Sequence, residues 1–275
     1  MNTKKTILIT GASSGMGKET ALHLIKEGHT VYGAARRIEQ MQDLLQAGGN
    51  AIKMDVTNED QVIACVQQII HEQGKIDVLI NNAGYGLYGA VEDISMADAH
   101  KQFDVNIFGL ARITKEVLPH MRAAKSGTII NVSSMGGKIY TPLGAWYHAT
   151  KHALEGWSDC LRLELKQFNI HVVIVEPGAI ATEFGDVVYE PMLQNSGQGP
   201  YSKLAQSVAK ATKEIYSKPN AASPSSVIAK VMSKAINSKR PKTRYVAGKM
   251  AKPLMFIRKY FGDRIFDAAV MSQTK

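Results

Sequence analysis

Cysteine and long apolar runs are both scarce in this chain. Cys65 and Cys160 are the only cysteines in 275 residues, and they form no CxxC motif, so neither a disulfide framework nor a bound metal is expected. No stretch approaches the roughly 18 apolar residues of a membrane-spanning helix, and the apolar run after Met1–Lys5 is too short for a secretory signal. A cytoplasmic protein is therefore predicted.

Acidic residues are rare in the last quarter of the sequence. Residues 201–275 hold 16 Lys and Arg against 3 Asp and Glu, whereas residues 1–200 hold 17 against 21. A basic segment can attract a phosphorylated substrate, an anionic membrane or nucleic acid, or it can be an ordinary solvated face. The segment has no helix-turn-helix signature, so nucleic acid is not an expected partner.

Short apolar runs rich in β-branched residues alternate with helix-length periodic segments. The predicted strands are Thr6–Thr10, Thr30–Ala35, Ala51–Met54, Val78–Asn81, Thr128–Val132 and His171–Glu176. The clearest predicted helices are Gly15–Glu27, Asn58–Gln73 and Ala145–Phe168. Strands that alternate with helices predict an α/β fold, a doubly wound and mostly parallel sheet of Rossmann type with helices on both faces.

The pattern divides the chain into a core at residues 1–185 and a lid and tail at 186–275 within the same domain. Residues 185–222 are rich in Gly and Pro and predict a mobile excursion around one or two short helices. A helix, a last edge strand and a basic amphipathic helix are expected at Ser225–Asn237, Thr243–Val246 and Lys252–Met271.

A glycine-rich turn joins the first predicted strand to the first predicted helix. Gly11, Gly15 and Gly17 allow a tight turn, and the helix start offers unpaired N–H groups to a pyrophosphate. Ser13, Ser14 and Met16 complete this predicted dinucleotide site. The alternative is a purely structural strand-to-helix turn.

The end of the second predicted strand bears on the choice of cofactor. Ala35 occupies the place of the acid that binds the ribose of NAD, and Arg36 follows it. A guanidinium binds phosphate well, so NADP(H) is favoured over NAD(H). Alternatively, Arg36 and Arg37 only solvate the surface, and either cofactor is accepted.

Tyr147 and Lys151 lie one helical turn apart, so the phenol and the ammonium share a face. Interconversion of a ketone and an alcohol needs an acid/base beside the nicotinamide. A free tyrosine titrates about three units above neutral pH, which corresponds to roughly 4 kcal/mol. The Lys151 charge is expected to stabilise the phenolate. Ser134, after the fifth predicted strand, could bind the substrate oxygen, with Ser133 as its competitor.

These motifs together closely resemble the classical short-chain dehydrogenase/reductase family over about residues 5–185. The family's order is matched by the turn Thr10–Gly17, Asp55, Asn81-Asn82-Ala83-Gly84, Asn106, Ser134, Tyr147 with Lys151, and Pro177-Gly178 with Thr182.

The resemblance implies a role for each of these residues, and it selects Ser134 over Ser133 as the catalytic serine. Asp55 and the Val56 backbone would hold the adenine. Asn106 would hold a backbone kink and a water near Lys151. Asn82, Ala83 and Gly84 would line the adenosine ribose. Pro177, Gly178 and Thr182 would seat the nicotinamide. The resemblance also implies a homodimer or homotetramer.

The residues around the predicted site are mostly apolar, so a hydrophobic ketone or secondary alcohol is expected as substrate in preference to a sugar. The arrangement Ala34-Ala35-Arg36-Arg37 and the extended tail resemble family members that act on steroid-like or retinoid-like substrates. The pocket candidates are Met135, Gly136, Gly137, Leu143, Trp146, Ile180 and Phe184. The basic tail could close over substrate, contact a second subunit or lie peripherally on an anionic membrane. A nucleotide-sensing regulator without catalytic activity is an alternative, but the intact Tyr147 and Lys151 pair argues against it.

Overall fold

The computed structural model describes residues 3–218 and 220–272 of the chain. Its centre is a seven-stranded sheet in the order β3-β2-β1-β4-β5-β6-β9, and every neighbouring pair is parallel. The strands of this sheet are β1 Thr6–Thr10, β2 Thr30–Ala35, β3 Asn50–Lys53, β4 Val78–Asn81, β5 Gly127–Val132, β6 Ile170–Pro177 and β9 Arg244–Ala247. A small second sheet pairs β7 (Ile180–Ala181) with β8 (Ser223–Pro224).

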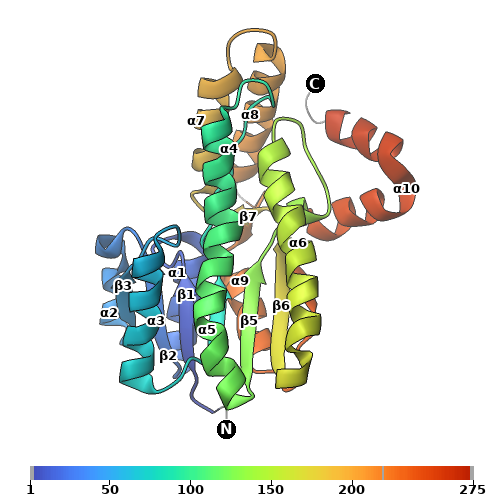
Figure 1. Ribbon diagram of the computed structural model, residues 1–275. Coiled ribbons are helices and arrows are strands. Elements are labelled where there is room, and N and C mark those ends of the chain that lie inside the picture. The colour runs from blue at the N-terminus through green and yellow to red at the C-terminus, as the bar shows by residue number, and fades with distance from the viewer. Residues whose placement is uncertain (1–2, 219, 273–275) are drawn as a thin grey trace.

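Helices cover both faces of the large sheet (Figure 1). The α-helices are α1 Gly15–Lys26, α2 Gln42–Gln46, α3 Glu59–Gln73, α4 Met96–Phe103, α5 Leu110–Ala124, α6 Ala145–Leu165, α7 Phe184–Ser196, α8 Ser202–Ser217, α9 Ser226–Ile236 and α10 Ala251–Ser272. Shorter 3₁₀ turns are η1 Ile38–Met41, η3 Met135–Gly137 and η4 Lys166–Phe168, and a π-helical turn, η2, spans Asp104–Gly109.

Alternate residues of the central strands feed two separate cores. Ile7 and Ile9 of β1 pack with α1, α2 and α9, whereas Leu8 packs on the other face with α3, α5 and α6. Burial on both faces explains why these strands are continuous apolar runs instead of alternating ones. The predicted doubly wound sheet is therefore confirmed, and the strands begin and end within about a residue of the expected positions.

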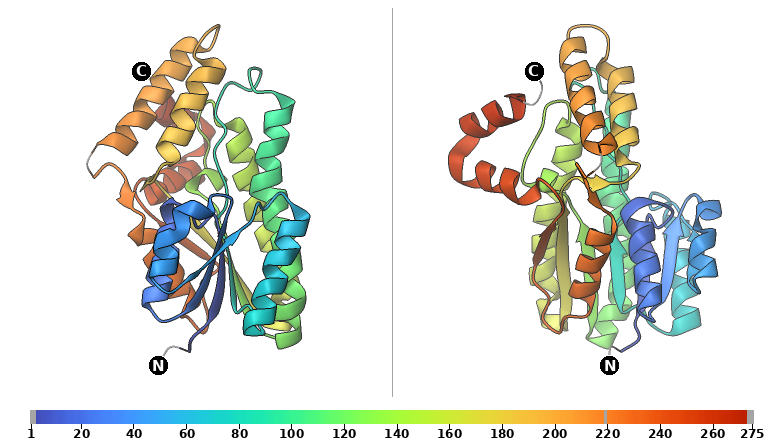
Figure 2. Two further views of the ribbon diagram at one scale, coloured as in Figure 1. Left: turned by 90° about the vertical axis from the view of Figure 1, so that its left-hand side faces the viewer. Right: turned by 180° about the vertical axis from the view of Figure 1, so that it is seen from behind.

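The segment expected to hold one or two short helices contains two, α7 of 13 residues and α8 of 16 residues. They form a helical pair with its own apolar core around Val188, Met192 and Val208. Figure 2 shows this pair standing over the end of the sheet opposite the N-terminus. Pro191, which suggested irregularity, lies inside α7, so the packing between the two helices outweighs the local preference of this residue.

The C-terminal amphipathic helix also differs from expectation. It is bent at Gly262, whose φ of 75° and ψ of 179° are not helical. Two helical segments therefore meet at this glycine, and Figures 1 and 2 show them projecting beside the main body.

Candidate active site

The glycine-rich turn follows β1 at the carboxyl edge of the sheet. Gly11 and Gly15 have positive φ angles of 68° and 54°, a region that glycine adopts without strain. A Cβ at Gly17 would overlap the Gly11 carbonyl oxygen and the Asn82 side-chain amide. All three predicted glycines are thus required by the backbone path of this turn.

The start of α1 is open to an anion. Ser14 precedes the helix with extended backbone and makes no side-chain cap, and the first turn carries no acidic residue. The first N–H groups can therefore bind a phosphate. Thr182 approaches from the segment after β6, since its Cγ2 would lie 3.3 Å from a Cβ at Gly15. This cradle fits the pyrophosphate of a dinucleotide.

Thr10 and Asn82 fasten the turn to the end of β4. The Asn82 amide donates to the carbonyl oxygens of Thr10 (3.0 Å) and Gly11 (3.1 Å). The Thr10 hydroxyl accepts the backbone N–H groups of Asn82 and Ala83, both at 3.0 Å. The Asn82 side chain therefore shapes the turn. Asn81 is structural as well, donating to Thr114 and Asn131.

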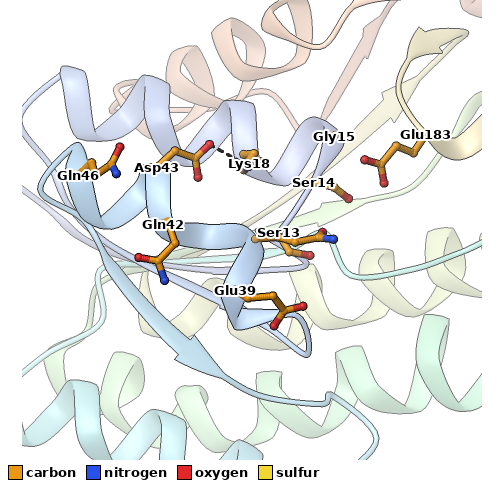
Figure 3. A pocket seen from close by; sticks show the side chains of 10 residues that line it. Ser13, Ser14, Gly15, Lys18, Glu39, Gln42, Asp43, Gln46 and Glu183 are labelled. Carbon is orange, nitrogen blue, oxygen red and sulfur yellow. Dashed lines mark ion pairs between the residues drawn. The ribbon is translucent and has the colours of Figure 1, made fainter.

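A polar cavity of about 520 Å³ adjoins this turn (Figure 3). Its lining residues are Ser13, Ser14, Gly15, Lys18, Glu39, Gln40, Gln42, Asp43, Gln46 and Glu183. Lys18 is paired with Asp43 at 2.8 Å, so its charge is already balanced.

The two arginines after β2 lie differently. Arg37, which sequence reasoning placed second to Arg36, donates from Nη2 to the Ser14 hydroxyl at 3.3 Å. Arg36 is exposed directly after the buried Ala35.

Asp55 and Val56 lie after β3, beside the same edge. Asp55 Oδ1 accepts the backbone N–H and the hydroxyl of Thr57, at 2.9 and 2.8 Å. The Val56 carbonyl accepts Arg112 Nη1 at 2.7 Å, and the Val56 side chain packs on Gly109. These contacts hold the loop in a fixed conformation.

Tyr147 and Lys151 are both buried on α6, with exposed fractions of 8% each. Lys151 Nζ lies 5.9 Å from the Tyr147 ring centroid and donates to the Val132 carbonyl at 2.8 Å. Burial lowers the pKa of Lys151 to about 8, and the Glu155 charge opposes that shift. The phenol and the ammonium therefore face one small region, as their spacing predicted.

Burial raises the pKa of Tyr147 to about 12, and a hydrogen bond from Ser134 acts in the opposite direction. The Lys151 ammonium donates to the Val132 carbonyl, and desolvation of the phenol sets the direction of this shift. The phenol is accordingly protonated at neutral pH.

Ser134 stands in extended backbone ahead of η3, and its Oγ accepts the Gly136 N–H at 2.9 Å. Ser133 was expected to bond locally, but its buried hydroxyl has no partner within residues 3–218 and 220–272. Of the two serines, Ser134 is the one whose hydroxyl acts to lower the pKa of the Tyr147 phenol.

Asn106 lies inside the π-helical turn η2, which is a backbone irregularity of the kind expected. Its side chain exchanges hydrogen bonds with the backbone of Tyr85, at 3.1 and 3.0 Å, and donates to Thr150 at 3.1 Å. A Cβ at Gly84 would lie 3.1 Å from Asn106 Oδ1 and 3.9 Å from Lys151 Nζ. Glycine at position 84 therefore keeps open the space between Asn106 and Lys151.

Aromatic rings surround Tyr147. The ring centroids of Tyr88 and Phe184 lie 5.8 and 5.7 Å from that of Tyr147, and Tyr216 of α8 follows Phe184 at 6.5 Å. Sequence reasoning selected Phe184 but missed Tyr88 and Tyr216, which carry no local motif. Trp146 instead packs on Phe103 of α4 at 6.4 Å, so it does not join this group.

His148 fixes the loop between Ser134 and α6. Its Nε2 accepts the Thr141 N–H at 3.1 Å, so the proton is on Nδ1, which donates to the Gly136 carbonyl at 2.9 Å. Burial lowers the pKa of His148 to about 4 and keeps it neutral. Across the described residues there is no His, Cys, Asp and Glu cluster that could hold a metal.

The Pro177-Gly178 segment ends β6 and borders the cradle. A Cβ at Gly178 would overlap the Lys249 carbonyl, and the Gly178 N–H donates to Ala247 at 2.8 Å. The structure thus gathers the predicted motif residues along one edge of the sheet. A phosphate cradle next to a buried tyrosine, lysine and serine defines an oxidoreductase that works with a nicotinamide dinucleotide.

Comparison with known proteins identifies the family. Residues 5–192 match the sequence model described as short chain dehydrogenase. The chain belongs to the short-chain dehydrogenase/reductase family and is an NAD(P)-dependent oxidoreductase acting on CH–OH groups.

Individual relatives and structures support this assignment. The chain is 46% identical to 3-ketodihydrosphingosine reductase of Bacteroides thetaiotaomicron over 66% of this chain and 65% of that protein. It is 34% identical to retinol dehydrogenase 8 of Bos taurus over 92% of this chain and 85% of that protein. A solved structure of serine dehydrogenase complexed with NADP⁺ matches with a TM-score of 0.77 and 26% identity, covering 90% of this chain and 96% of that one.

Proposed function

We propose that this enzyme interconverts a hydrophobic ketone and the corresponding secondary alcohol with NADP(H). The observation that carries the proposal is the buried Tyr147 phenol, whose pKa Ser134 acts to lower and whose ring lies beside those of Tyr88 and Phe184. An aromatic and apolar surrounding favours a steroid-like, retinoid-like or other lipid-like substrate over a sugar. The names of the two relatives, which refer to a keto-sphingoid and to retinol, support the same class.

In this proposal Tyr147 exchanges the proton. The bound dinucleotide supplies or accepts the hydride at the substrate carbon. During reduction the Tyr147 hydroxyl gives its proton to the carbonyl oxygen, and Ser134 donates a hydrogen bond to that oxygen as negative charge develops on it. Burial keeps the Tyr147 phenol protonated, so its proton is available for this step.

Lys151 and Asn106 support the proton transfer. The Lys151 ammonium stabilises the phenolate that remains after reduction, and its pKa near 8 allows it to pass a proton on. Asn106 holds the η2 turn and Thr150, whose hydroxyl donates to the Tyr147 carbonyl at 2.8 Å. A water beside Asn106 would complete the relay to solvent.

The cofactor is proposed to lie along the edge from the glycine turn to Thr182. Gly11, Ser13, Ser14, Gly15, Met16 and Gly17 would bind the pyrophosphate, Asp55 and Val56 the adenine, Asn82, Ala83 and Gly84 the ribose, and Pro177, Gly178 and Thr182 the nicotinamide. NADP(H) is preferred in this proposal because Ala35 offers no acid to the ribose and the exposed Arg36 follows it. Arg37 lies beside Ser14 and is also paired with Glu183 at 3.8 Å.

A homodimer or homotetramer is proposed as the working form. Exposed apolar side chains on the outer surface support this, namely Phe108 of η2 at 56% and Leu163 of α6 at 66% exposure. None of the helices within the described ranges has the length and apolarity to cross a bilayer. The cytoplasmic location stays a prediction.

Replacement of the phenol tests the proposal. Tyr147→Phe is expected to lower kcat for ketone reduction by about 10²–10⁴-fold while the Kd for NADPH changes little. The measurement is steady-state NADPH oxidation with a panel of lipid-like and small polar ketones, together with a fluorescence titration of the cofactor. Unchanged turnover in the variant, or turnover of small polar carbonyls only, would overturn the assignment. Cofactor binding without turnover of any ketone by the wild type would favour a nucleotide-sensing regulator.

A further inference from the structure

The C-terminal helix α10 carries an aromatic cluster that the body of the protein does not cover. Phe256, Tyr260 and Phe261 are 56%, 62% and 52% exposed. Their rings pack on one another, with centroids 4.8 Å apart for Phe256 and Tyr260 and 6.1 Å apart for Phe256 and Phe261. Ile265, just beyond the bend, is also 52% exposed. Contiguous exposed apolar side chains of this size mark an interaction surface.

Basic residues surround this aromatic cluster. The segment from 249 to 264 contains five basic residues and one acidic residue. Arg258 is neutralised by Asp263 at 2.6 Å, whereas Lys252, Lys259 and Arg264 are exposed. Lys259 Nζ lies 5.1 Å from the Tyr260 ring centroid, so charge and aromatic surface are adjacent.

The second segment of α10 anchors the helix to the body. Phe266 is fully buried against the ring of Tyr140 at 5.1 Å, and the Tyr140 hydroxyl donates to Asp267 at 2.8 Å. Arg258, on the first segment, lies over the Tyr140 ring, 5.2 Å from its centroid. The helix is therefore held in place while its first segment presents the aromatic cluster outward, as the projecting red helix in Figure 2 illustrates.

We infer that the first segment of α10 docks the enzyme on the surface of an anionic lipid bilayer. The aromatic rings would enter the boundary between headgroups and acyl chains, where amphipathic aromatic side chains are favoured. Lys252, Lys259 and Arg264 would lie among the anionic headgroups.

Charge distinguishes a bilayer from a second copy of the chain. A two-fold interface places the same patch against itself, so it would bring two sets of basic side chains together. An anionic membrane instead neutralises them. The helix does not cross the bilayer, which agrees with the lack of any spanning helix in the described residues.

Docking would also bring the catalytic region close to the lipid. Tyr140, which anchors α10, follows Ser134 and η3 on the same loop. A membrane-dissolved substrate could then reach the site without crossing bulk water, a consequence that rests on the proposed function. The docking itself does not depend on turnover.

The test is sedimentation of the full chain with vesicles. Binding is expected to vesicles of phosphatidylcholine mixed with phosphatidylserine, to weaken with added salt, and to be at least tenfold weaker for phosphatidylcholine alone. Neutralising Lys252→Gln with Lys259→Gln should weaken binding on the order of 30-fold, since each charge near the surface is worth about fivefold. The double variant Phe256→Ser with Phe261→Ser should also lose at least tenfold in affinity.

Val91→Ser is the matched control, because Val91 is 62% exposed but lies in the segment between β4 and α4, outside α10. It should bind vesicles like the wild type. Equal binding to neutral and anionic vesicles, no binding to either, or full binding by the Phe256 and Phe261 variant would overturn the inference. Light scattering tests the other possible occupant, a second copy of the chain. If the Phe256 and Phe261 variant loses its oligomeric state but still binds vesicles, this surface is a contact between copies. Ketone reduction measured without vesicles tests the proposed function separately.

Discussion

At the scale of single residues, the end of β6 holds an unusual buried carboxyl group. Glu176 is 1% exposed, and neither of its oxygens has a hydrogen-bond partner among the described residues. Arg244 lies 3.6 Å away but is already bonded to Glu155 and Asp159. Lys138, the residue after η3, pairs with Glu155 at 2.9 Å. Burial, reinforced by the Glu155 charge, raises the pKa of Glu176 above its usual 4.5.

This raised pKa predicts how stability depends on pH. The folded state holds a proton on Glu176 at pH values where the unfolded state has released it. The stabilisation is therefore complete below pH 4.5 and is lost as the pH rises through the folded pKa. The Glu176→Gln side chain cannot ionise, so the variant should not lose this stability as the pH rises. The difference in the free energy of unfolding, variant minus wild type, should therefore be about 1–3 kcal/mol larger at pH 8 than at pH 5.

Urea unfolding of both proteins at the two pH values measures this difference. Glu183→Gln is the control, since it removes the carboxylate of a side chain that is 65% exposed. A stability difference between Glu176→Gln and the wild type that is the same at pH 5 and pH 8 would show that Glu176 does not titrate in this range.

Single residues also show where sequence reasoning ends. Tyr147 and Lys151 could be predicted because their relation is local, one turn of one helix. Tyr88 and Tyr216 could not, because each reaches Tyr147 or Phe184 only through the packing of separate elements. The charge balance around Glu176 likewise depends on α6, β6 and β9 meeting in space.

At the scale of elements, the start of α1 depends on close packing against the turn. The groups that a side chain at Gly17 would meet are the Gly11 backbone and the Asn82 amide, and neither can move without breaking the hydrogen bonds that shape the cradle. Gly17→Ala should therefore lower the free energy of unfolding by about 1–3 kcal/mol and raise the Kd for NADPH by at least about tenfold.

Gly156→Ala is the matched control for this substitution. Gly156 lies within α6, and nothing stands within 4 Å of a Cβ built there. Alanine should raise stability by about 0.5–1 kcal/mol because it favours the helix. Thermal unfolding and cofactor titration compare the two variants. If both behave alike, the contact at Gly17 does not limit the turn.

Elements differ in how far their sequence defines them. The central strands could be placed because runs of β-branched apolar residues fit a sheet buried on both faces. The bend in α10 could not, because Gly262 leaves the helix only so that Phe266 can pack on Tyr140. The α7 and α8 pair was also underestimated, since its apolar core forms between two segments that are individually weak.

At the scale of the whole molecule, the reacting groups and the cradle lie on one edge but on different parts of the sheet. The strand order reverses between β1 and β4, and the glycine turn lies at that switch point, where doubly wound sheets bind ligands. Tyr147 lies farther along, beyond β5, and Thr182 returns from β6 to contact the turn. A dinucleotide that spans this edge would contact segments from both halves of the sheet.

Cofactor binding should therefore stabilise the entire fold, and the extent should depend on the phosphate that distinguishes NADPH from NADH. At a concentration of 100 Kd a ligand adds about 2.7 kcal/mol to the free energy of unfolding, which for a chain of this size raises Tm by roughly 5–10 °C.

At equal concentrations NADPH is expected to raise Tm more than NADH. The variant Arg36→Ala should keep the NADH shift and lose most of the extra shift with NADPH, because it leaves the hydrogen bond between Arg37 and Ser14 at the cradle intact. Tyr147→Phe serves as the control and should retain both shifts. An equal or larger shift with NADH in the wild type would reverse the proposed preference and leave the catalytic assignment standing.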